Sequence, residues 1–294
     1  MFIEKRKQGK KEKYYLIHTY RIGEQVKRIS RYLGSDLTKR NLEVLKIRAE
    51  KLILEHMKDK HPLDITDYEL NELKKYEREI NIEYLHKKLN WREFTKNFTY
   101  NTNAIEGSTV TFKEAERLID KEIEPEDDDE RETLNVAEAV DFIKKTKLKL
   151  SLVLIRKLHQ ICFKNTKHFA GEFRDVEVAV VDSFGEIIHR GAPSSNVEKL
   201  LRELVIWYEK NHKKISPLLL AALTHNQFET IHPFQDGNGR VGRLLLNYVL
   251  LRHDYPPLNI KLKDRKNYYR VLQDFQNTGN IKSTLKFLIS QYRS

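Results

Sequence analysis

The sequence has little that would stabilise a chain covalently or hold it in a membrane. Its single cysteine, Cys162, excludes a disulfide within the chain, so a reducing compartment is expected. No apolar run is long enough to cross a bilayer, and the first residues are charged, unlike a secretory signal. We therefore expect a cytoplasmic protein that does not act at a membrane.

Negative charge is the scarcer sign. Lys and Arg number 54 against 43 Asp and Glu, which gives a formal net charge of +11. Such an excess attracts nucleic acids, nucleotides and acidic proteins. However, charged residues make up 33% of the chain, so the excess is spread over a solvated surface and serves solubility first. Net charge alone therefore gives no reason to expect nucleic-acid binding.

The N-terminal third divides into segments with different patterns. Residues 1–13 are basic and polar, which predicts a mobile tail. Residues 14–20 and 26–33 are rich in aromatic and β-branched residues and flank a turn at Gly23, which predicts a β-hairpin. Over residues 37–98 apolar side chains recur at helical spacing, and Pro62 separates two predicted helices.

These patterns predict a mainly helical protein with three regions. Beyond residue 98 helical periodicity dominates, with one interruption at residues 173–189. There Val176, Val178 and Val180 alternate with polar or small residues before a turn, which predicts a second hairpin. We expect an all-α fold with a β-hairpin and a small N-terminal β-hairpin. The predicted regions are 1–35 (tail and hairpin), 36–95 (helical) and 96–294 (main domain).

The most informative stretch is residues 231–243, Ile-His-Pro-Phe-Gln-Asp-Gly-Asn-Gly-Arg-Val-Gly-Arg. An apolar helix should end at His232, because a proline disfavours helical geometry at the residue before it. Glycines 237 and 239 tolerate a backbone in which successive amides turn inward toward an anion. A second apolar helix begins near Arg240, and its N-terminus adds partial positive charge. The stretch therefore predicts a phosphate-binding loop.

Four side chains with useful chemistry surround this loop. His232 titrates near neutrality and can serve as a general base. Asp236 is sufficient for Mg²⁺, which takes its remaining ligands from water and substrate phosphates. Arg240 and Arg243 lie three residues apart on the second helix and can both reach phosphate oxygens. Each feature alone fits an ordinary turn or a structural histidine, but together they predict a site for a magnesium nucleotide.

This stretch matches the Fic family motif, His-Pro-Phe-x-Asp/Glu-Gly-Asn-Gly-Arg-x-x-Arg, at every fixed position. The resemblance implies transfer of AMP from Mg·ATP to a Ser, Thr or Tyr hydroxyl of a target protein or of the chain itself. Related Doc-type kinases carry lysine at the second glycine, so Gly239 favours AMP transfer. The implied roles are general base for His232, Mg²⁺ ligand for Asp236, a buried anchor for Phe234, and nucleotide contacts from Gly237, Asn238, Gly239, Arg240 and Arg243.

A second match lies upstream, in a predicted helix near residues 97–106. Thr102, Glu106 and Gly107 fit the family's inhibitory pattern Ser/Thr-x-x-x-Glu-Gly/Asn. The same pattern also describes a helix that simply ends at a glycine. Its position before the main motif resembles the class with an N-terminal inhibitory helix. The resemblance implies that Glu106 pairs with Arg243 and blocks the γ-phosphate.

The resemblance covers roughly residues 97–294. Residues 171–174, Gly-Glu-Phe-Arg, resemble the start of the family's nucleotide-covering flap. Residues 1–95 are not covered; we expect them to pack on the core or to build a homodimer. The remaining implied nucleotide contacts are Val178, Ala179, Val180, Val181, Tyr268, Tyr269 and Asn277, with Gln276 as an alternative to Asn277 because the spacing differs by one residue.

Three other interpretations remain open. The same site can remove AMP from a modified protein, with Glu106 orienting water. Another nucleotide or a phosphodiester donor can replace ATP. In a different class, the chain is a nucleic-acid-binding regulator that uses its basic N-terminal hairpin, with a dormant Fic site.

Overall fold

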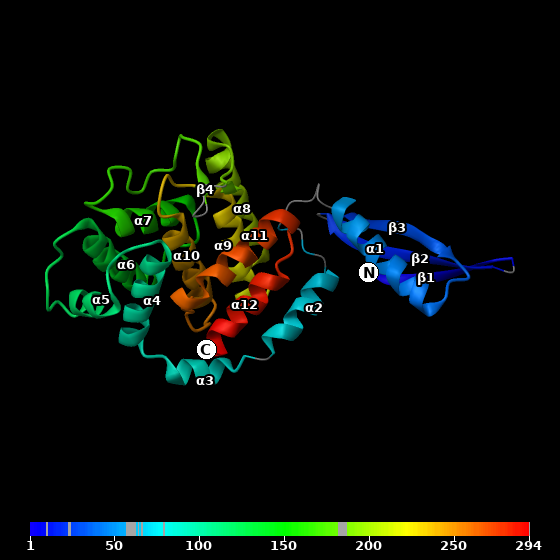
Figure 1. Cartoon of the computed structure of the whole chain (residues 1–294), viewed down its shortest axis with the longest axis horizontal. Coiled ribbons are helices and arrows are strands. Elements are labelled where there is room, and N and C mark those ends of the chain that lie inside the picture. Colours follow the sequence, from blue (N-terminus) through cyan, green and yellow to red (C-terminus); the bar gives the residue numbers. More distant parts are fainter. Residues whose placement is uncertain are drawn as a thin grey trace. The chain divides into compact units, whose positions relative to one another are not determined.

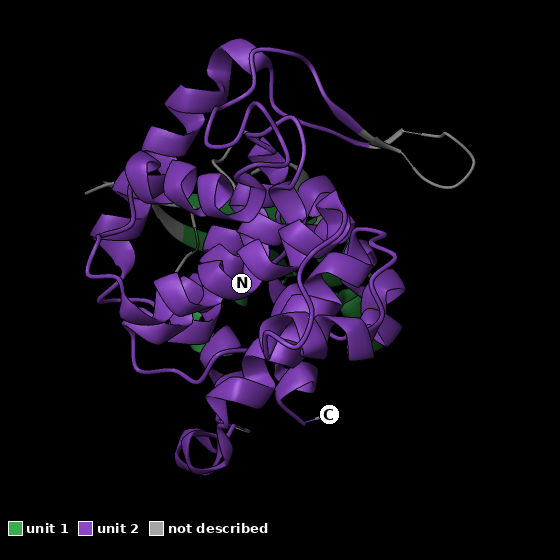
Figure 2. Ribbon diagram, turned by 90° about the vertical axis from the view of Figure 1, so that its left-hand side faces the viewer, with its two compact units in different colours: residues 1–72 green, residues 73–294 purple. Residues whose placement is uncertain are grey.

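The computed structural model of the chain describes residues 1–9, 11–22, 25–56, 63, 65, 67–78, 80–181 and 187–293. The chain forms two compact units, Met1–Glu72 and Leu73–Ser294 (Figure 2). Their boundary falls within the predicted helical region 36–95. Among the described residues, no helix combines the length and the apolar character that crossing a membrane requires.

The first unit contains a three-stranded antiparallel sheet in the order β1-β2-β3 (Figure 1). The predicted hairpin is confirmed as β2 (Lys11–Ile22) and β3 (Gln25–Ser35), with Tyr15 opposite Tyr32. Its turn at Gly23 lies outside the described residues.

The predicted mobile tail is wrong. Residues of the basic N-terminal segment form β1 (Phe2–Gln8), which pairs with β2 and places Ile3 opposite Leu16. The backbone groups at the free edge of a hairpin favour a further strand, and Ile3 supplies an apolar side chain for the face that the sheet buries.

One face of this sheet packs on helix α1 (Lys39–His56). Leu16 of the sheet and Ala49 and Ile53 of the helix are buried together. Ile3, Ile29 and Leu33 are partly buried against them. This cluster is what stabilises a sheet that would be marginal alone.

Residues 37–98 contain more helices than the predicted two. After α1 come α2 (Asp67–Glu77), α3 (Ile82–Lys88) and the start of α4 (Trp91–Ile105). The extra breaks follow from capping: Asn81 accepts a hydrogen bond from the Tyr84 amide, and the Asn90 side chain accepts from the amides of residues 92 and 93. Pro62 lies outside the described residues.

The second unit is helical around a central helix pair, which confirms the predicted all-α class (Figure 1). Helix α9 is buried at every position except Pro217 and Thr230, and its N-terminal half is apolar on all sides, which is typical of a central helix. Helices α8, α10, α11 and α12 contact α9, while α4, α6 and α7 contact α10. The helices from α5 onward are α5 (Phe112–Ile119), α6 (Asp128–Lys145), α7 (Leu152–Phe163), α8 (Val197–Asn211), α9 (Pro217–Ile231), α10 (Asn238–Arg252), α11 (Arg265–Thr278) and α12 (Lys282–Arg293).

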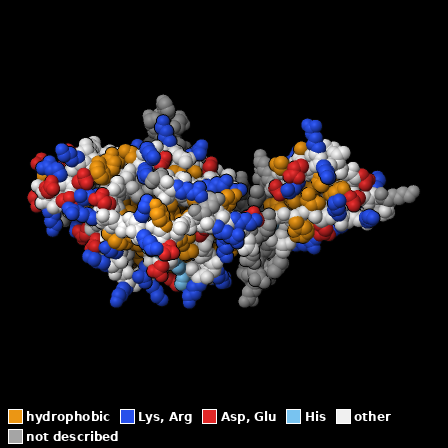
Figure 3. Space-filling model, turned by 90° about the horizontal axis from the view of Figure 1, so that it is seen from below, with side chains coloured by type: hydrophobic (Ala, Val, Ile, Leu, Met, Phe, Trp, Pro, Cys, Tyr) orange, Lys and Arg blue, Asp and Glu red, His pale blue; other side chains and the backbone are white. Residues whose placement is uncertain are grey.

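The predicted second hairpin is confirmed as β4 (Ala179–Val181) paired with β5 (Ile187–Arg190). Val176 and Val178 precede β4 instead of forming part of it, and the turn at residues 182–186 lies outside the described residues. On the face of the second unit shown in Figure 3, Lys and Arg side chains are scattered among other residues and do not form one basic patch.

Candidate active site

The loop between α9 and α10 has a fixed shape, which confirms the predicted helix–loop–helix. His232 ends α9 in the left-handed region with φ of 53°, and Gly237 precedes α10 with φ of 79°. Asn238 closes the loop: its Oδ1 accepts from the Phe234 amide at 2.8 Å, and its Nδ2 donates to the Phe234 carbonyl at 2.8 Å. The first amides of α10 lack helical partners, so they remain available to an anion.

Aromatic side chains pack against the loop and support it. Phe234 is buried, as predicted, and stacks on the His159 ring with 3.8 Å between centroids. A Cβ atom at Gly237 would lie 2.2 Å from the Phe163 ring. Position 237 therefore requires glycine both for its positive φ and for this close approach.

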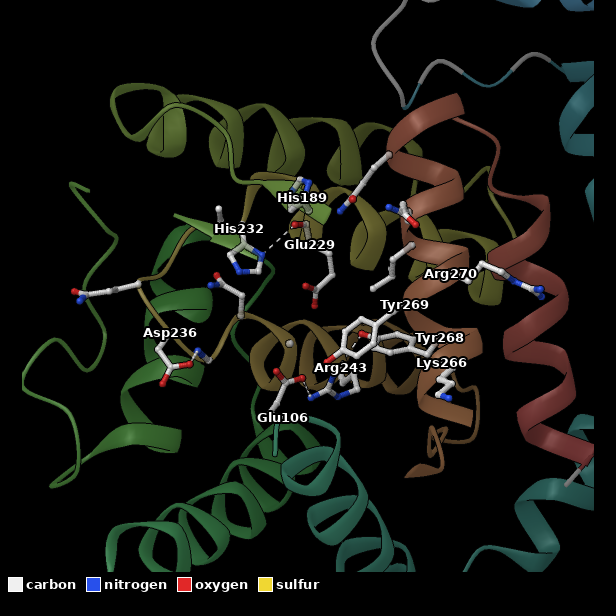
Figure 4. A pocket seen from close by; sticks show the side chains of 18 residues that line it. Glu106, His189, Glu229, His232, Asp236, Arg243, Lys266, Tyr268, Tyr269 and Arg270 are labelled. Atoms are coloured by element: carbon white, nitrogen blue, oxygen red, sulfur yellow. Dashed lines mark hydrogen bonds and ion pairs between the residues drawn. The ribbon is translucent and has the colours of Figure 1, made fainter. Parts of the chain in front are cut away.

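A cavity of about 440 Å³ opens beside the loop (Figure 4). Residues from the end of α4, from β4, β5 and α9, from the loop, and from α10 and α11 line it. Segments far apart in sequence thus meet at one site. The predicted site residues in its wall are Glu106, Ala179, His232, Asp236, Gly237, Asn238, Gly239, Arg243, Tyr268 and Tyr269.

His232 is held in the form that a general base requires. Its Nδ1 lies 3.3 Å from the Glu229 carbonyl oxygen, which can only accept, so the proton is on Nδ1 and Nε2 carries the lone pair. Burial and then the neighbouring His189 lower the pKa of His232 to about 4. The imidazole is therefore neutral near pH 7.

The backbone around His232 is held by Arg174, which belongs to the segment that resembles the start of the flap. Its Nε donates to the His232 carbonyl at 2.7 Å, and its NH2 donates to the Ile231 carbonyl at 3.3 Å. Its NH1 donates to the Val176 carbonyl at 2.7 Å. Arg174 thus links the end of α9 to the start of the flap.

Asp236 lies at the rim of the cavity with its side chain 50% exposed. Its Oδ1 accepts from the Gly237 amide at 2.6 Å, while its Oδ2 lies 3.8 Å from Arg240 and 3.9 Å from Lys167. The described residues contain no group of three or more His, Cys, Asp or Glu side chains that could hold a metal ion. A single half-exposed carboxylate beside an anion loop fits Mg²⁺, which completes its shell with water and substrate phosphates.

The two sequence motifs meet at Arg243, whose side chain is 1% exposed. Its Nε donates to Thr102 Oγ1 at 2.7 Å, and its NH2 donates to the Thr102 carbonyl at 3.0 Å. The same NH2 donates to Glu106 Oε1 at 2.7 Å. The expected contact between Glu106 and Arg243 is therefore present, although the two residues are 137 positions apart.

The Glu106 carboxylate lies directly on the phosphate-binding loop. A Cβ atom at Gly239 would approach Glu106 Oε1 to 2.2 Å and Arg243 NH1 to 3.0 Å. Glu106 is the C-cap of α4, and Gly107 follows it with φ of 98°. The end of α4 thus places a negative charge where we expect nucleotide phosphates.

Arg240 does not line the cavity. Its guanidinium forms a buried ion pair with Glu132 of α6 and stacks over the Phe163 ring at 4.3 Å. Arg240 therefore supports the loop from behind, and its predicted contact with the nucleotide stays a prediction.

We expect Glu132→Ala to lower the free energy of unfolding by about 3 kcal/mol, because it removes the buried carboxylate partner of Arg240 and leaves only Asp236, at 3.8 Å, to balance the buried charge. Denaturant unfolding of the full chain measures this. The matched control is Glu138→Ala, which removes an exposed partner of Lys164 and should cost no more than about 1 kcal/mol. An equal loss of unfolding free energy in both variants would contradict the stabilising role of the buried ion pair between Arg240 and Glu132.

Some of the predicted flap and adenine-side residues line the cavity, while their contacts with a nucleotide stay predictions. Ala179, Tyr268 and Tyr269 line the cavity, but Val178 does not. Gln276 lines it in place of Asn277, which agrees with the alternative that the spacing left open. The side chains of Val180 and Val181 lie outside the described residues.

Sequence reasoning missed several residues of the cavity wall. Glu229 and His189 line it, as do Lys266 and Arg270 of α11. The sequence could have indicated Glu229, because it precedes His232 by three positions and therefore lies on the same helix face. Nothing in the sequence indicates Lys266 and Arg270, because the chain carries many other charged residues.

Comparison with known proteins agrees with this fold and site. Residues 149–250 match the Fic/DOC family. A structure of a Fic domain containing signaling protein from Bacteroides thetaiotaomicron superposes with a TM-score of 0.63 at 25% identity, covering 76% of this chain and 92% of that one. Fic-1 from C. elegans shares the fold at 23% identity, with a TM-score of 0.63, covering 87% and 76%.

The fold and the site thus resemble those of a Fic domain, and residues 149–250 match the Fic/DOC family. The protein named Protein adenylyltransferase Fic from Nematostella vectensis is 30% identical over 198 residues, which cover 64% of this chain and 45% of that protein. The protein of that name from Drosophila melanogaster is 30% identical over 197 residues, covering 64% and 39%. The chain therefore spans less than half the length of these relatives.

Proposed function

We propose that this chain is a protein adenylyltransferase, which moves AMP from Mg·ATP onto a Ser, Thr or Tyr hydroxyl of a target protein or of itself. The observation that carries this proposal is the meeting of a neutral, correctly protonated His232 with a glycine-rich anion loop and Arg243 in one cavity. The names of the relatives agree with it.

In the proposed reaction, His232 Nε2 accepts the proton of the target hydroxyl, whose oxygen attacks the α-phosphorus. The bond from that phosphorus to the bridging oxygen of the β-phosphate breaks, and pyrophosphate leaves. Amides at residues 237–239 and the N-terminus of α10 stabilise the phosphate charge, and Arg243 holds the outer phosphates. Asp236 would hold Mg²⁺, which supplies further neutralisation of the phosphates.

Glu106 supports a self-inhibited resting state. Its carboxylate occupies the guanidinium that the γ-phosphate needs, and it adds negative charge above Gly239. ATP that binds beside it has misplaced phosphates, and a misplacement of about 1 Å can cost roughly a hundredfold in rate. The target chain is expected to lie along the β4–β5 hairpin as an added strand.

The test compares two positions of the radioactive label in ATP. The full-length Glu106→Gly variant is incubated with a native lysate and ATP carrying ³²P at either the α- or the γ-phosphate. Relative to the lysate alone, we expect additional label on protein from the α position only, competed by unlabelled ATP more than by GTP, CTP or UTP. Label from the γ position would instead show a kinase, and preferential competition by another nucleotide would replace ATP as the donor.

A further inference from the structure

Glu229 is a buried carboxyl group in the cavity wall that the proposed chemistry does not use. It is 6% exposed, and its Oε1 has no hydrogen-bond partner among the described residues. In Figure 4 its side chain points into the space between His232 and Arg243. An unpartnered buried polar group is costly, so its retention at this position calls for a ligand.

The nearest groups do not satisfy this carboxyl. His225 Nδ1 lies 4.0 Å from Oε1, beyond hydrogen-bond reach, and the other ring nitrogen of His225 contacts the Tyr268 hydroxyl at 3.0 Å. A Cβ atom at Gly242 would approach Oε1 to 2.1 Å. Gly242 follows Gly239 by three positions, so Glu229 and Glu106 lie on the same face of α10 near its N-terminus.

The charges around Glu229 come from every neighbouring element. Arg243 faces it from α10 and Glu106 from α4, with His225 and His232 on its own helix. Burial raises its pKa to about 8, Arg243 opposes that shift and Glu106 adds to it. The carboxyl is therefore protonated at pH 7. The other titratable groups of the cavity wall are His189 of β5 and Lys266, Tyr268, Tyr269 and Arg270 of α11.

We infer that Glu229 binds the nucleotide as an uncharged acid, with its O–H donating a hydrogen bond to a phosphate oxygen that Arg243 also holds. The inference rests on the proposed function, since it takes a nucleotide as the ligand of this cavity. A protonated carboxyl group can donate a hydrogen bond to a phosphate oxygen, whereas its ionised form would repel the phosphates.

The sign of the pH dependence follows from linkage. Bound phosphates raise the pKa of Glu229 above its value in the free protein, so binding is strongest while the free carboxyl is protonated. Affinity is then lost as the pH rises through the free pKa, by up to about tenfold per pH unit for one proton.

The experiment measures equilibrium binding of MgATP between pH 6.5 and 9.5. The parent is the full chain carrying Glu106→Gly, which frees Arg243, and His232→Ala, which prevents turnover and removes a second titrating group. We expect its affinity to fall as the pH rises, and the isosteric Glu229→Gln to bind MgATP with no such fall. Equal pH slopes with Glu and Gln at position 229 would overturn the inference.

The matched control is Glu77→Gln, added to the same parent. Glu77 is a partly buried carboxyl whose pKa is also raised by burial, but it accepts hydrogen bonds from Ser216 and the Leu219 amide and lies outside the cavity. This variant should keep the pH slope of the parent; its loss would also overturn the inference. Absence of MgATP binding by the parent at pH 6.5 would remove the proposed function itself, which separates the two failures.

Discussion

Glu106→Gly is expected to raise AMP transfer by about a hundredfold, measured as the initial rate of α-³²P incorporation into protein at fixed Mg·ATP. The substitution removes the acceptor 2.7 Å from Arg243 NH2 and the charge above Gly239. Phosphates can then take the aligned position, and alignment is worth roughly this factor. Because residue 106 is the C-cap of α4, a glycine there should leave the helix intact.

Two companion variants separate this effect from a general loosening of α4. Glu93→Ala removes an exposed acidic residue from the first turn of the same helix, outside the cavity, and should leave the rate at its starting level. Glu106→Gly combined with Arg243→Ala should lose the gain, because the released guanidinium is what causes it. Equal labelling by the unmodified chain and Glu106→Gly would exclude inhibition by Glu106.

His232→Ala in the Glu106→Gly background is expected to lower AMP transfer by about two to four orders of magnitude. The loss follows from removing the lone pair that accepts the hydroxyl proton, while the loop and Arg243 that bind phosphates remain. The substitution should therefore lower the rate of AMP transfer but leave the affinity for MgATP nearly unchanged. The same labelling assay and a binding titration measure the two quantities.

His168→Ala serves as the control for this loss. His168 is an exposed histidine of the same unit that does not line the cavity, and its removal should change neither quantity. If His232→Ala kept the full rate, another base would have to be sought in the cavity, with His189 the first candidate.

The parts of the site that lie on one continuous stretch were predictable from the sequence. Proline after His232, the glycines and the start of α10 act through local backbone preferences, which need no tertiary information. The contact between Glu106 and Arg243 was reached only through the family resemblance. Nothing in local chemistry indicates that these two side chains meet.

The predictions that failed depend on tertiary contacts, because the partner of each side chain or strand is set by residues elsewhere in the sequence. Arg240 and Arg243 are both suitable phosphate ligands on one helix, but Arg240 pairs with Glu132, which is 108 positions away in the sequence, and does not line the cavity. A shift of one residue turns a helical side chain by about 100°, which is why Gln276 lines the wall and Asn277 does not. Strand β1 was missed because its apolar face becomes visible only once β2 is beside it.

The space beside Gly239 serves both the inhibited and the active form of the proposed site. A side chain at position 239 would overlap the Glu106 carboxylate, because its Cβ atom would lie only 2.2 Å from Glu106 Oε1. In the proposed mechanism the same volume belongs to the phosphates. A larger residue 239 would therefore displace the Glu106 carboxylate and the phosphates of the proposed mechanism together, whereas a change at the end of α4, such as Glu106→Gly, removes the carboxylate alone.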